Sequence, residues 1–449
     1  MVIVIRKKLI ANVIESGFMA IDGIGGRTTF YLAIAMSEQL NYQVFLDSLL
    51  CVCNQFDKLR GTLQKGIFHD YWHRKEQIGL DELPVVERYL SLEQNETIEE
   101  AFYRQLEQEK NIGIDVEKEM PVKCIHYTTN QVKESMFLFL FHHGLLDGRG
   151  AMELLNYIGQ CYQDRIEGKI AEPFYNTYSI RKIVQSFPLE EKNRKEKKTQ
   201  RKRVNAMGNF YQVMEEGKKL RENIPVRSVA RFTVSGKDFE TLRAVCKERF
   251  CTINDLIMYA VLKTSYEIQE QHGKVFEFVG CSTAVDVRRY LPERKKFYGD
   301  CAINEIFLVD SEVLKTSDWN EYTRQLAEFK RKTLGRGFFE WMNRLEFVPA
   351  SIMRFFLEKM MVLMSKETLQ KGICISNCGN VENYMPAWSG IMKNAAFFPT
   401  INNEGFPQIG VSSYCGELSV TIIKEKDQTG CASQLCNLIE KNLYSIIKM

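Results

Sequence analysis

The strongest constraint on this fold is a short, fully apolar run that ends in two histidines and a glycine-rich turn. The run is MFLFLF at Met136–Phe141, and it continues directly into HHGLLDGRG. A membrane-spanning helix needs about 18 or more apolar residues, so a run this short predicts a buried strand. The preceding segment KEMPVKCIHYTTN predicts a partner strand, and the two together predict a hairpin.

The periodicity changes immediately after the histidines. From residue 152 onward, apolar side chains recur at intervals of three and four, which predicts a helix. The positions are Met152, Leu154, Leu155, Ile158, Cys161 and Tyr162. His142 and His143 are therefore expected at the junction between a strand and a helix.

The length of 449 residues exceeds what one hydrophobic core usually fills. A charged, poorly periodic stretch divides the chain, so we expect an N-terminal subdomain over 1–180, a charged interdomain connection over 181–226 and a C-terminal subdomain over 227–449. The connection contains EKNRKEKKTQRKR at 191–203. This basic cluster is either a solvated face or a docking patch for an acidic partner.

Strand and helix patterns alternate in both halves of the chain. LRGTLQKGIFHDYWH predicts a strand pair, and Thr252 is the expected N-cap of a helix in which Asp255 follows three residues later. Further strands are predicted at VARFTVSG, FEFVGCSTAVDV, CAINEIFLV, GICISNC, QIGVSSYCG and ELSVTII, with a last helix over 432–447. These patterns predict an α/β fold of two layers, with a mixed sheet packed against helices in each half.

Charge and cysteine content narrow the functional classes. A net charge of +3 is too small for a typical nucleic-acid-binding protein. The 13 cysteines form no CxxC pair, which indicates reduced thiols in a cytoplasmic protein. The start, MVIVIRKKLI, predicts a first strand and lacks the features of a secretion signal, and no segment has the length of a membrane span.

The sharpest chemical signal is HHGLLDG, in which Asp147 lies four residues after His143. A histidine at a strand end can face a cleft, while the carboxylate turns back to hold the loop. Three other interpretations stay open on these residues alone: a surface pair, a satisfied core histidine, or metal ligands. A metal site needs further ligands, and the other histidines are His69, His73, His126 and His272.

HHGLLDG resembles the HHxxxDG motif of the chloramphenicol acetyltransferase-like superfamily, which includes peptide-synthetase condensation domains and alcohol acetyltransferases. The surrounding segments follow in the order typical of that superfamily across nearly the whole chain. In the second half these are TINDLIMYAVLK, STAVDVRRYLP, ISNCGNV and VSSYCGELSV. A DFGWG sequence, typical of the plant branch, does not occur.

The resemblance implies two acetyltransferase-like subdomains with an active-site channel between them, and an acyltransferase that uses no metal. It makes His143 the general base, His142 and Gly148 loop-shaping residues, and Asp147 a structural partner of Arg288. Ser376 and Asn377 are expected in the channel, where they either stabilise the oxyanion or serve only as structural hydrogen bonders. A solvent-facing charge is the alternative for Arg288.

The implied reaction moves an acyl group from a thioester to a hydroxyl or amine. No cofactor is expected to be permanently bound, and acyl-CoA or acyl-phosphopantetheine is the expected co-substrate. The partners are a small alcohol or amine acceptor and, in one version, an acyl carrier protein. The alternatives are a stand-alone condensation enzyme that forms amide bonds on carrier proteins and a catalytically silent carrier-protein docking module.

One further segment is rich in methionine and phenylalanine. Residues Phe338–Met364 read FFEWMNRLEFVPASIMRFFLEKMMVLM. Flexible thioethers adapt to apolar ligands of variable shape, yet the same residues fill ordinary cores. The segment therefore predicts either a pocket for an apolar chain or a core, and Met361 and Met364 are the positions where added bulk distinguishes the two.

Overall fold

The structure is a computed structural model. It describes residues 8–22, 28–108, 112–169, 179–188, 227–291, 299–366, 373–400, 407–425 and 432–448. The elements of the first half are β1 (Lys8–Ile10), α1 (Val13–Ile21), β2 (Thr29–Met36), α2 (Tyr42–Gln55), η1 (Asp57–Arg60), β3 (Gly61–Gln64), β4 (Tyr71–Arg74), η2 (Leu80–Glu82), β5 (Val85–Tyr89), α3 (Ile98–Gln108), β6 (Val122–Thr128), β7 (Ser135–His142), α4 (Gly148–Ile166) and α5 (Ile180–Ser186).

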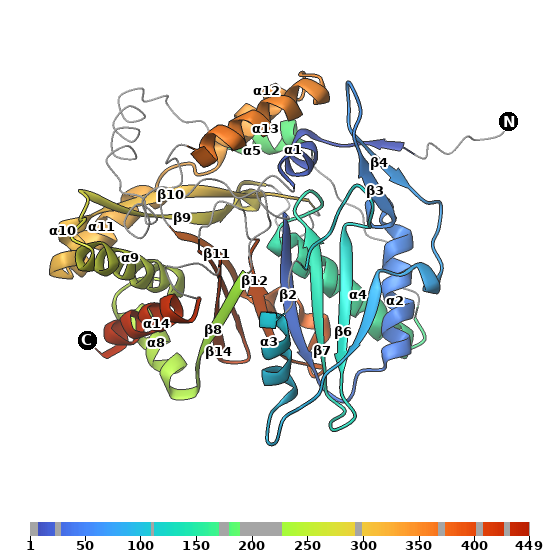
Figure 1. Ribbon diagram of the computed structural model, residues 1–449, viewed down its shortest axis with the longest axis horizontal. Helices are drawn as coiled ribbons and strands as arrows, with labels where there is room; N and C mark the ends of the chain where they lie inside the picture. Colours follow the sequence, from blue (N-terminus) through green and yellow to red (C-terminus); the bar gives the residue numbers. More distant parts are fainter. Residues whose placement is uncertain are drawn as a thin grey trace.

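The apolar run lies in the middle of a five-stranded sheet with the order β12-β2-β7-β6-β5. The phenylalanines at its odd-numbered positions pack against α2 and α4, and the side chains at its even-numbered positions pack on the opposite face with α3. Figure 1 shows α2 and α4 on one side of this sheet. Because successive side chains of a strand point to opposite faces, a strand covered on both faces is apolar at every position.

The second half contains a six-stranded sheet with the order β10-β9-β11-β13-β14-β8. Its elements are β8 (Arg227–Ser235), α8 (Gly236–Glu248), α9 (Ile253–Gln271), β9 (Phe278–Asp286), η3 (Val287–Tyr290), β10 (Ala302–Asp310), α10 (Ser311–Thr316), α11 (Trp319–Lys330), α12 (Arg336–Leu345), α13 (Ala350–Lys366), β11 (Ile373–Asn380), η4 (Val381–Asn383), η5 (Pro386–Trp388), β12 (Met392–Phe398), β13 (Gln408–Tyr414), β14 (Glu417–Glu425) and α14 (Ala432–Lys448). Helices α8, α9 and α14 share one core with this sheet (Figure 1).

Several local expectations are confirmed. β6 and β7 pair as an antiparallel hairpin, and so do β3 and β4. Helix α9 begins at a capping box, in which the Thr252 hydroxyl accepts the N–H of Asp255 and the Asp255 carboxylate accepts the N–H of Thr252. The mixed α/β architecture expected from the alternating patterns is present in both halves.

One strand from the second half of the chain belongs to the sheet of the first half. β12 lies late in the chain, yet it pairs antiparallel with β2 and forms one edge of the first sheet. β12 also contacts β13 and β14 of the second sheet, so it connects the two layers. The proposed boundaries at 1–180 and 227–449 stay predictions, with the addition that one strand of the first sheet comes from beyond residue 227.

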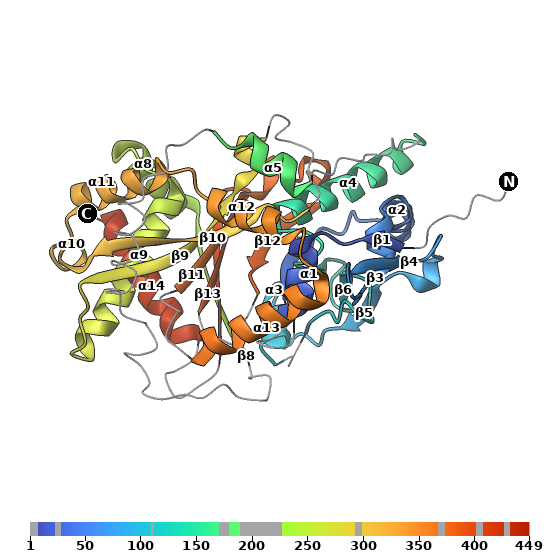
Figure 2. The ribbon, with the colours of Figure 1, turned by 90° about the horizontal axis from the view of Figure 1, so that it is seen from above.

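Helices α1, α12 and α13 lie together beside the junction of the two halves (Figure 2). α1 contacts both α12 and α13, and the N–H of Ala350 at the start of α13 donates to the Phe68 carbonyl at 2.9 Å. Helix α5 packs against α12. Helices α12 and α13 of the second half therefore pack against the first half.

Some predicted features fall beyond the described residues. The basic cluster at 191–203 and the side chains of Met361 and Met364 lie outside them. The strand expected over the first ten residues is described only as β1 (Lys8–Ile10). Among the described residues, no helix combines the length and apolarity needed to cross a bilayer.

Candidate active site

The HHGLLDG segment forms a tight connection between β7 and α4. The N–H of His143 donates to the Thr28 carbonyl at 2.8 Å, and the N–H of Leu145 donates back to the His142 carbonyl at 2.9 Å. Asp147 is the N-cap of α4, and its Oδ1 accepts the N–H of Gly150 at 2.8 Å. Backbone bonds at one end and a helix cap at the other thus hold the loop in place.

His142 is completely buried, and both of its ring nitrogens have partners. Nδ1 accepts the N–H of Gly144 at 3.0 Å, so the ring proton resides on Nε2. Nε2 lies 2.9 Å from the Thr28 hydroxyl, which donates in turn to Asp22. This chain of contacts fixes the neutral ring and fits the loop-shaping role expected for His142.

His143 lies in a different environment, with 22% of its side chain exposed. Its Nδ1 is 2.8 Å from Oδ2 of Asp300. The ring stacks on Phe18 with a centroid separation of 4.8 Å and an interplanar angle of 15°, and Phe30 packs at 5.0 Å. When Nδ1–H donates to the carboxylate, the lone pair is on Nε2, which has no hydrogen-bond partner among the described residues.

Asp300 is a site residue that the sequence analysis did not identify. It lies two residues before β10 and belongs to no recognisable motif, so only the three-dimensional contact reveals it. Burial raises the pKa of the Asp300 carboxyl, while His143 and the N–H of Ala302 oppose that rise. A buried carboxylate on Nδ1 orients the ring and stabilises the cation that forms when Nε2 takes a proton.

Asp147 and Arg288 form the ion pair expected from the sequence. Nη1 of Arg288 donates to Oδ2 of Asp147 at 2.7 Å, and both side chains are buried. Burial raises the pKa of Asp147, but Arg288 and the N–H groups of Gly150 and Cys301 outweigh it, so the pKa lies below its usual value. With both oxygens occupied, this carboxylate is an anchor and not a base.

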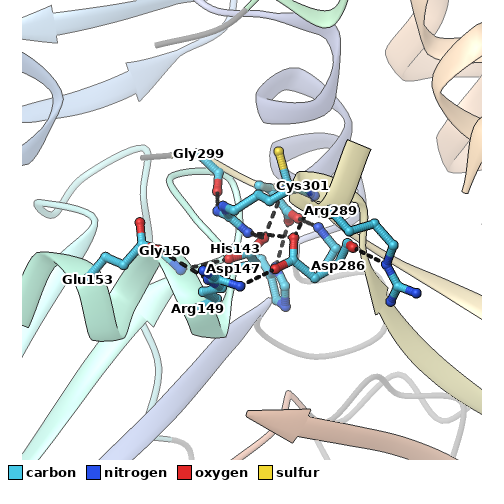
Figure 3. Close-up of polar contacts among 12 residues, drawn as sticks. His143, Asp147, Arg149, Gly150, Glu153, Asp286, Arg289, Gly299 and Cys301 are labelled. Atoms are coloured by element: carbon cyan, nitrogen blue, oxygen red, sulfur yellow. Dashed lines mark hydrogen bonds and ion pairs between the residues drawn. The ribbon is translucent and has the colours of Figure 1, made fainter. Parts of the chain in front are cut away.

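The same anchor reaches the backbone next to Asp300 (Figure 3). Oδ2 of Asp147 also accepts the N–H of Cys301 at 2.7 Å, and Nη2 of Arg288 donates to the Gly299 carbonyl at 2.8 Å. The segment 299–301 is therefore held on both sides of Asp300. The four-residue spacing between His143 and Asp147 lets one loop contribute both the imidazole and the anchor that positions its carboxylate partner.

His143 lines a cavity of about 810 Å³ between the two halves. Ser376 and Asn377, from β11, line the same cavity, together with residues of α1, α9, α12 and α13. Volumes of this size are typical of small-molecule sites. The channel expected between the subdomains is therefore present, and it contains every site residue whose side chain was expected to meet substrate.

The Asn377 amide is partly engaged within the protein. Its Nδ2 donates to Oδ1 of Asn254 at 3.0 Å, and its Oδ1 accepts the N–H of Gly379 at 2.7 Å. Ser376 lies on the same face of β11 as Cys374 and forms a side-chain hydrogen bond with it, while burial raises the pKa of the Cys374 thiol to about 11. Both residues thus line the cavity and also have hydrogen-bond partners within the protein.

Gly148 permits a close approach at the start of α4. A Cβ atom here would lie 2.9 Å from Sγ of Cys378 and 3.1 Å from Cε2 of Phe397. Burial raises the pKa of the Cys378 thiol strongly, so this sulfur is held as a neutral thiol although it lines the cavity. The glycine therefore brings α4 against β11 and β12, as its loop-shaping role requires.

Comparison with models of known protein families finds no match, and comparison with curated protein sequences finds none. Solved structures, in contrast, match over almost the entire chain. The trichothecene 15-O-acetyltransferase TRI3 from Fusarium sporotrichioides has a TM-score of 0.69 at 12% identity, and the match covers 98% of this chain and 95% of that one.

Two other kinds of protein match similarly. The first condensation domain of the CDA synthetase has a TM-score of 0.64 at 11% identity, covering 98% of this chain and 95% of that one. Polyketide synthase associated protein 5 from Mycobacterium tuberculosis has a TM-score of 0.60 at 12% identity, covering 98% and 99%. The chain therefore has the two-subdomain, chloramphenicol acetyltransferase-like fold that acetyltransferases and condensation domains share.

Proposed function

We propose that this protein is an acyltransferase that moves an acyl group from a thioester to a hydroxyl or amine, with His143 as the general base. One observation carries the proposal: Nδ1 of His143 is 2.8 Å from the Asp300 carboxylate, in a ring that lines the interdomain cavity. That contact selects the tautomer in which Nε2 can accept a proton. Histidine is suited to the task because it takes up and returns protons near neutral pH.

The reaction needs only the chain's own groups and two substrates. Nε2 of His143 removes the proton from the acceptor as its oxygen or nitrogen forms a bond to the thioester carbonyl carbon. The tetrahedral intermediate then collapses, the carbon–sulfur bond breaks, and the sulfur takes the proton from His143. The product is an ester or amide plus a free thiol, so the protein ends in its starting state.

The oxyanion of the intermediate requires a hydrogen-bond donor. Ser376 is our candidate, since its hydroxyl belongs to a strand that lines the same cavity as His143. Asp300 contributes at the other end, because its buried negative charge favours the imidazolium that exists at the same moment.

The donor we propose is acyl-CoA or an acyl chain on the phosphopantetheine arm of a carrier protein, with no permanently bound cofactor. We favour acyl-CoA and a small alcohol or amine acceptor, in the cytoplasm. TRI3 carries the name of an O-acetyltransferase, and the fold it shares with this chain supports ester formation. The condensation-domain neighbours support the rival product, an amide formed on carrier proteins.

A non-catalytic alternative is a carrier-protein docking module, with the basic cluster at 191–203 as its contact. The His143–Asp300 contact argues against it, because docking requires neither a fixed tautomer nor a histidine in a cavity.

A matrix of acyl-CoA donors and alcohol or amine acceptors tests the proposal, with free thiol followed by a colorimetric reagent and products by mass spectrometry. We expect acceptor-dependent thiol release by the wild type and its near loss in His143→Ala. Thiol release and product formation that are the same in both proteins would contradict the proposal. Tight carrier-protein binding without turnover of any donor would favour the docking module.

A further inference from the structure

The cavity around His143 consists of two chemically different parts. Its charged lining residues come only from the start of α4 and from the β9–η3 segment, among the described residues: Asp147, Arg149, Asp286, Arg288 and Arg289. The part enclosed by α1, α12 and α13 has no charged side chain among its described lining residues. We call this second part the apolar arm.

One wall of the apolar arm is a single face of α1. The lining positions follow the helical period, so they project from the same side: Val13, Ile14, Gly17, Phe18 and Ile21. Gly17 lets the opposite wall approach closely, since a Cβ there would lie in ordinary contact, 3.6 Å, with Cδ1 of Leu357 on α13. The wall is thus smooth and apolar along the helix.

The opposite wall is formed by α12 and α13. It consists of Phe338, Trp341, Met342, Leu357 and Met360. Phe339 is next to Phe338 in sequence but does not line the cavity, and it is fully buried in a core cluster that also contains Met342 and Leu357. The arm therefore borders this core directly. The methionine- and phenylalanine-rich segment therefore contributes to both of the alternatives that its composition predicted.

The apolar arm begins at the proposed base and ends at the surface. Phe18 stacks on the His143 ring at 4.8 Å, so one end of the arm is in contact with the reactive imidazole. At the other end, Trp341 is 41% exposed and Met360 is 38% exposed. A substrate atom at His143 can therefore be continuous with a chain that runs between the helices towards solvent.

We propose that the apolar arm binds an extended hydrocarbon chain carried by one of the two reactants, either the acyl group of the donor or an alkyl chain on the acceptor. The inference rests on the proposed function, since it assumes that the reacting carbon lies at His143. Each methylene moved from water into an apolar site favours binding by about fourfold. Short-chain substrates leave the arm unfilled and forgo that gain.

The test uses a substitution at the outer end of the arm, where it least disturbs the core. Met360→Trp narrows the arm, and Phe356→Trp is the matched control, because Phe356 lies on the same helix, is 69% exposed and does not line the cavity. The kcat/KM is measured for straight-chain acyl-CoA donors of two to twelve carbons with one acceptor, and for n-alkanol acceptors of the same range with acetyl-CoA.

We expect Met360→Trp to lower the ratio of long-chain to short-chain kcat/KM by about tenfold or more in one of the two series. A shift in the donor series identifies the acyl chain as the occupant, and a shift in the acceptor series identifies the alkyl chain. Phe356→Trp should leave both profiles as in the wild type. Profiles that Met360→Trp does not change, or that Phe356→Trp changes equally, would overturn the inference while leaving the acyltransferase proposal intact.

A binding measurement separates failure of the inference from failure of the proposed function. Calorimetry with unreactive S-alkyl-CoA thioethers and with n-alkanols reports occupancy without turnover. If affinity grows with chain length and Met360→Trp weakens it, but the protein turns over no thioester, then the apolar arm is supported and the acyltransferase proposal is contradicted. Affinity independent of chain length in both series would reject the arm.

Discussion

The HHGLLDG loop contains two kinds of residue, a rigid scaffold and a reactive group. The scaffold consists of His142, which is fully buried, and Asp147, whose carboxylate has a partner on each oxygen. The reactive group is His143, which has one nitrogen held by Asp300 and lines a cavity. Neighbouring residues at a strand end project to opposite sides, so identical side chains acquire different roles. Burial and partners distinguish them, whereas residue type does not.

The sharpest test of this contrast is His143→Ala against His142→Ala. Loss of a general base typically costs about 10²- to 10⁴-fold in rate, so we expect His143→Ala to lose most activity and to keep its stability. His142→Ala should retain more activity and unfold at lower denaturant, because it leaves Thr28 and the Gly144 N–H without their partner.

Single-turnover rates and denaturant unfolding of both variants provide the comparison. A dead His142→Ala beside an active His143→Ala would reverse the roles of the two histidines.

At the buried scaffold, we expect a large loss of stability from Arg288→Ala. Removing one partner of a buried ion pair typically costs about 3–5 kcal/mol, because the remaining charge stays buried. Arg149→Ala is the matched control, since Arg149 pairs with Glu153 and Asp286 but is 26% exposed. A partly exposed pair is screened by solvent, so we expect Arg149→Ala to cost less than Arg288→Ala. Equal losses of unfolding free energy in the two variants would show that the Asp147–Arg288 corner is not the anchor described above.

At the partner of the reactive histidine, we expect substitution of Asp300 to have a smaller effect on rate and to cause no loss of stability. Asp300→Asn keeps an oxygen for Nδ1–H but removes the charge, so we expect a rate loss of about tenfold to a hundredfold, and a greater loss for Asp300→Ala. Because burial raises the pKa of Asp300 in the folded state, its contribution to stability is present at low pH and is lost as pH rises through that pKa. Asp300→Asn lacks this ionisation, so its unfolding free energy at neutral pH should equal or exceed that of the wild type.

Measured rate–pH profiles separate the role of Asp300 from a structural one. The wild type should lose activity as acid protonates Asp300, at a pH above the range of an ordinary carboxyl, and Asp300→Asn should lack that step. If the pH–rate profile of Asp300→Asn coincides with that of the wild type, Asp300 has no role in the reaction.

The smallest effect is expected where the start of α4 contacts β11. Gly148→Ala places a methyl group against Sγ of Cys378, and overpacking of this kind costs about 1–3 kcal/mol. The double variant Gly148→Ala with Cys378→Ala should recover part of that loss, because the sulfur is the nearer of the two contacts. Thermal unfolding of the two single variants and the double variant measures the coupling, and strictly additive losses would place the strain elsewhere.

The sequence predicted those parts of the site that depend on local spacing. HHGLLDG placed two histidines at a strand end, and the family resemblance of HHGLLDG and VDVRR implied the pair of Asp147 with Arg288. Asp300 was not, because it becomes a partner of His143 only when the start of β10 is held beside the loop by Asp147 and Arg288. No periodicity or neighbouring residue type encodes that contact.

The fold, like the site, was predictable from the sequence only in part. The continuous apolar run predicted a buried strand, and the structure explains it by helices on both faces of β7. β12 was not among the predicted strands, and its place in the first sheet was not predictable, because its partner β2 lies near the other end of the chain. Such pairing depends on tertiary packing and not on local pattern.

The late position of β12 has a consequence for the order of events during synthesis. Until residues 392–398 leave the ribosome, β2 has no neighbour on one side, and its backbone N–H and C=O groups form a bare edge. The first sheet must wait for almost the entire polypeptide before it can close, and contacts between segments so distant in sequence form slowly. Truncation before β12 would therefore yield an aggregation-prone fragment and not an isolated N-terminal subdomain, so the two halves depend on each other for solubility as well as for chemistry.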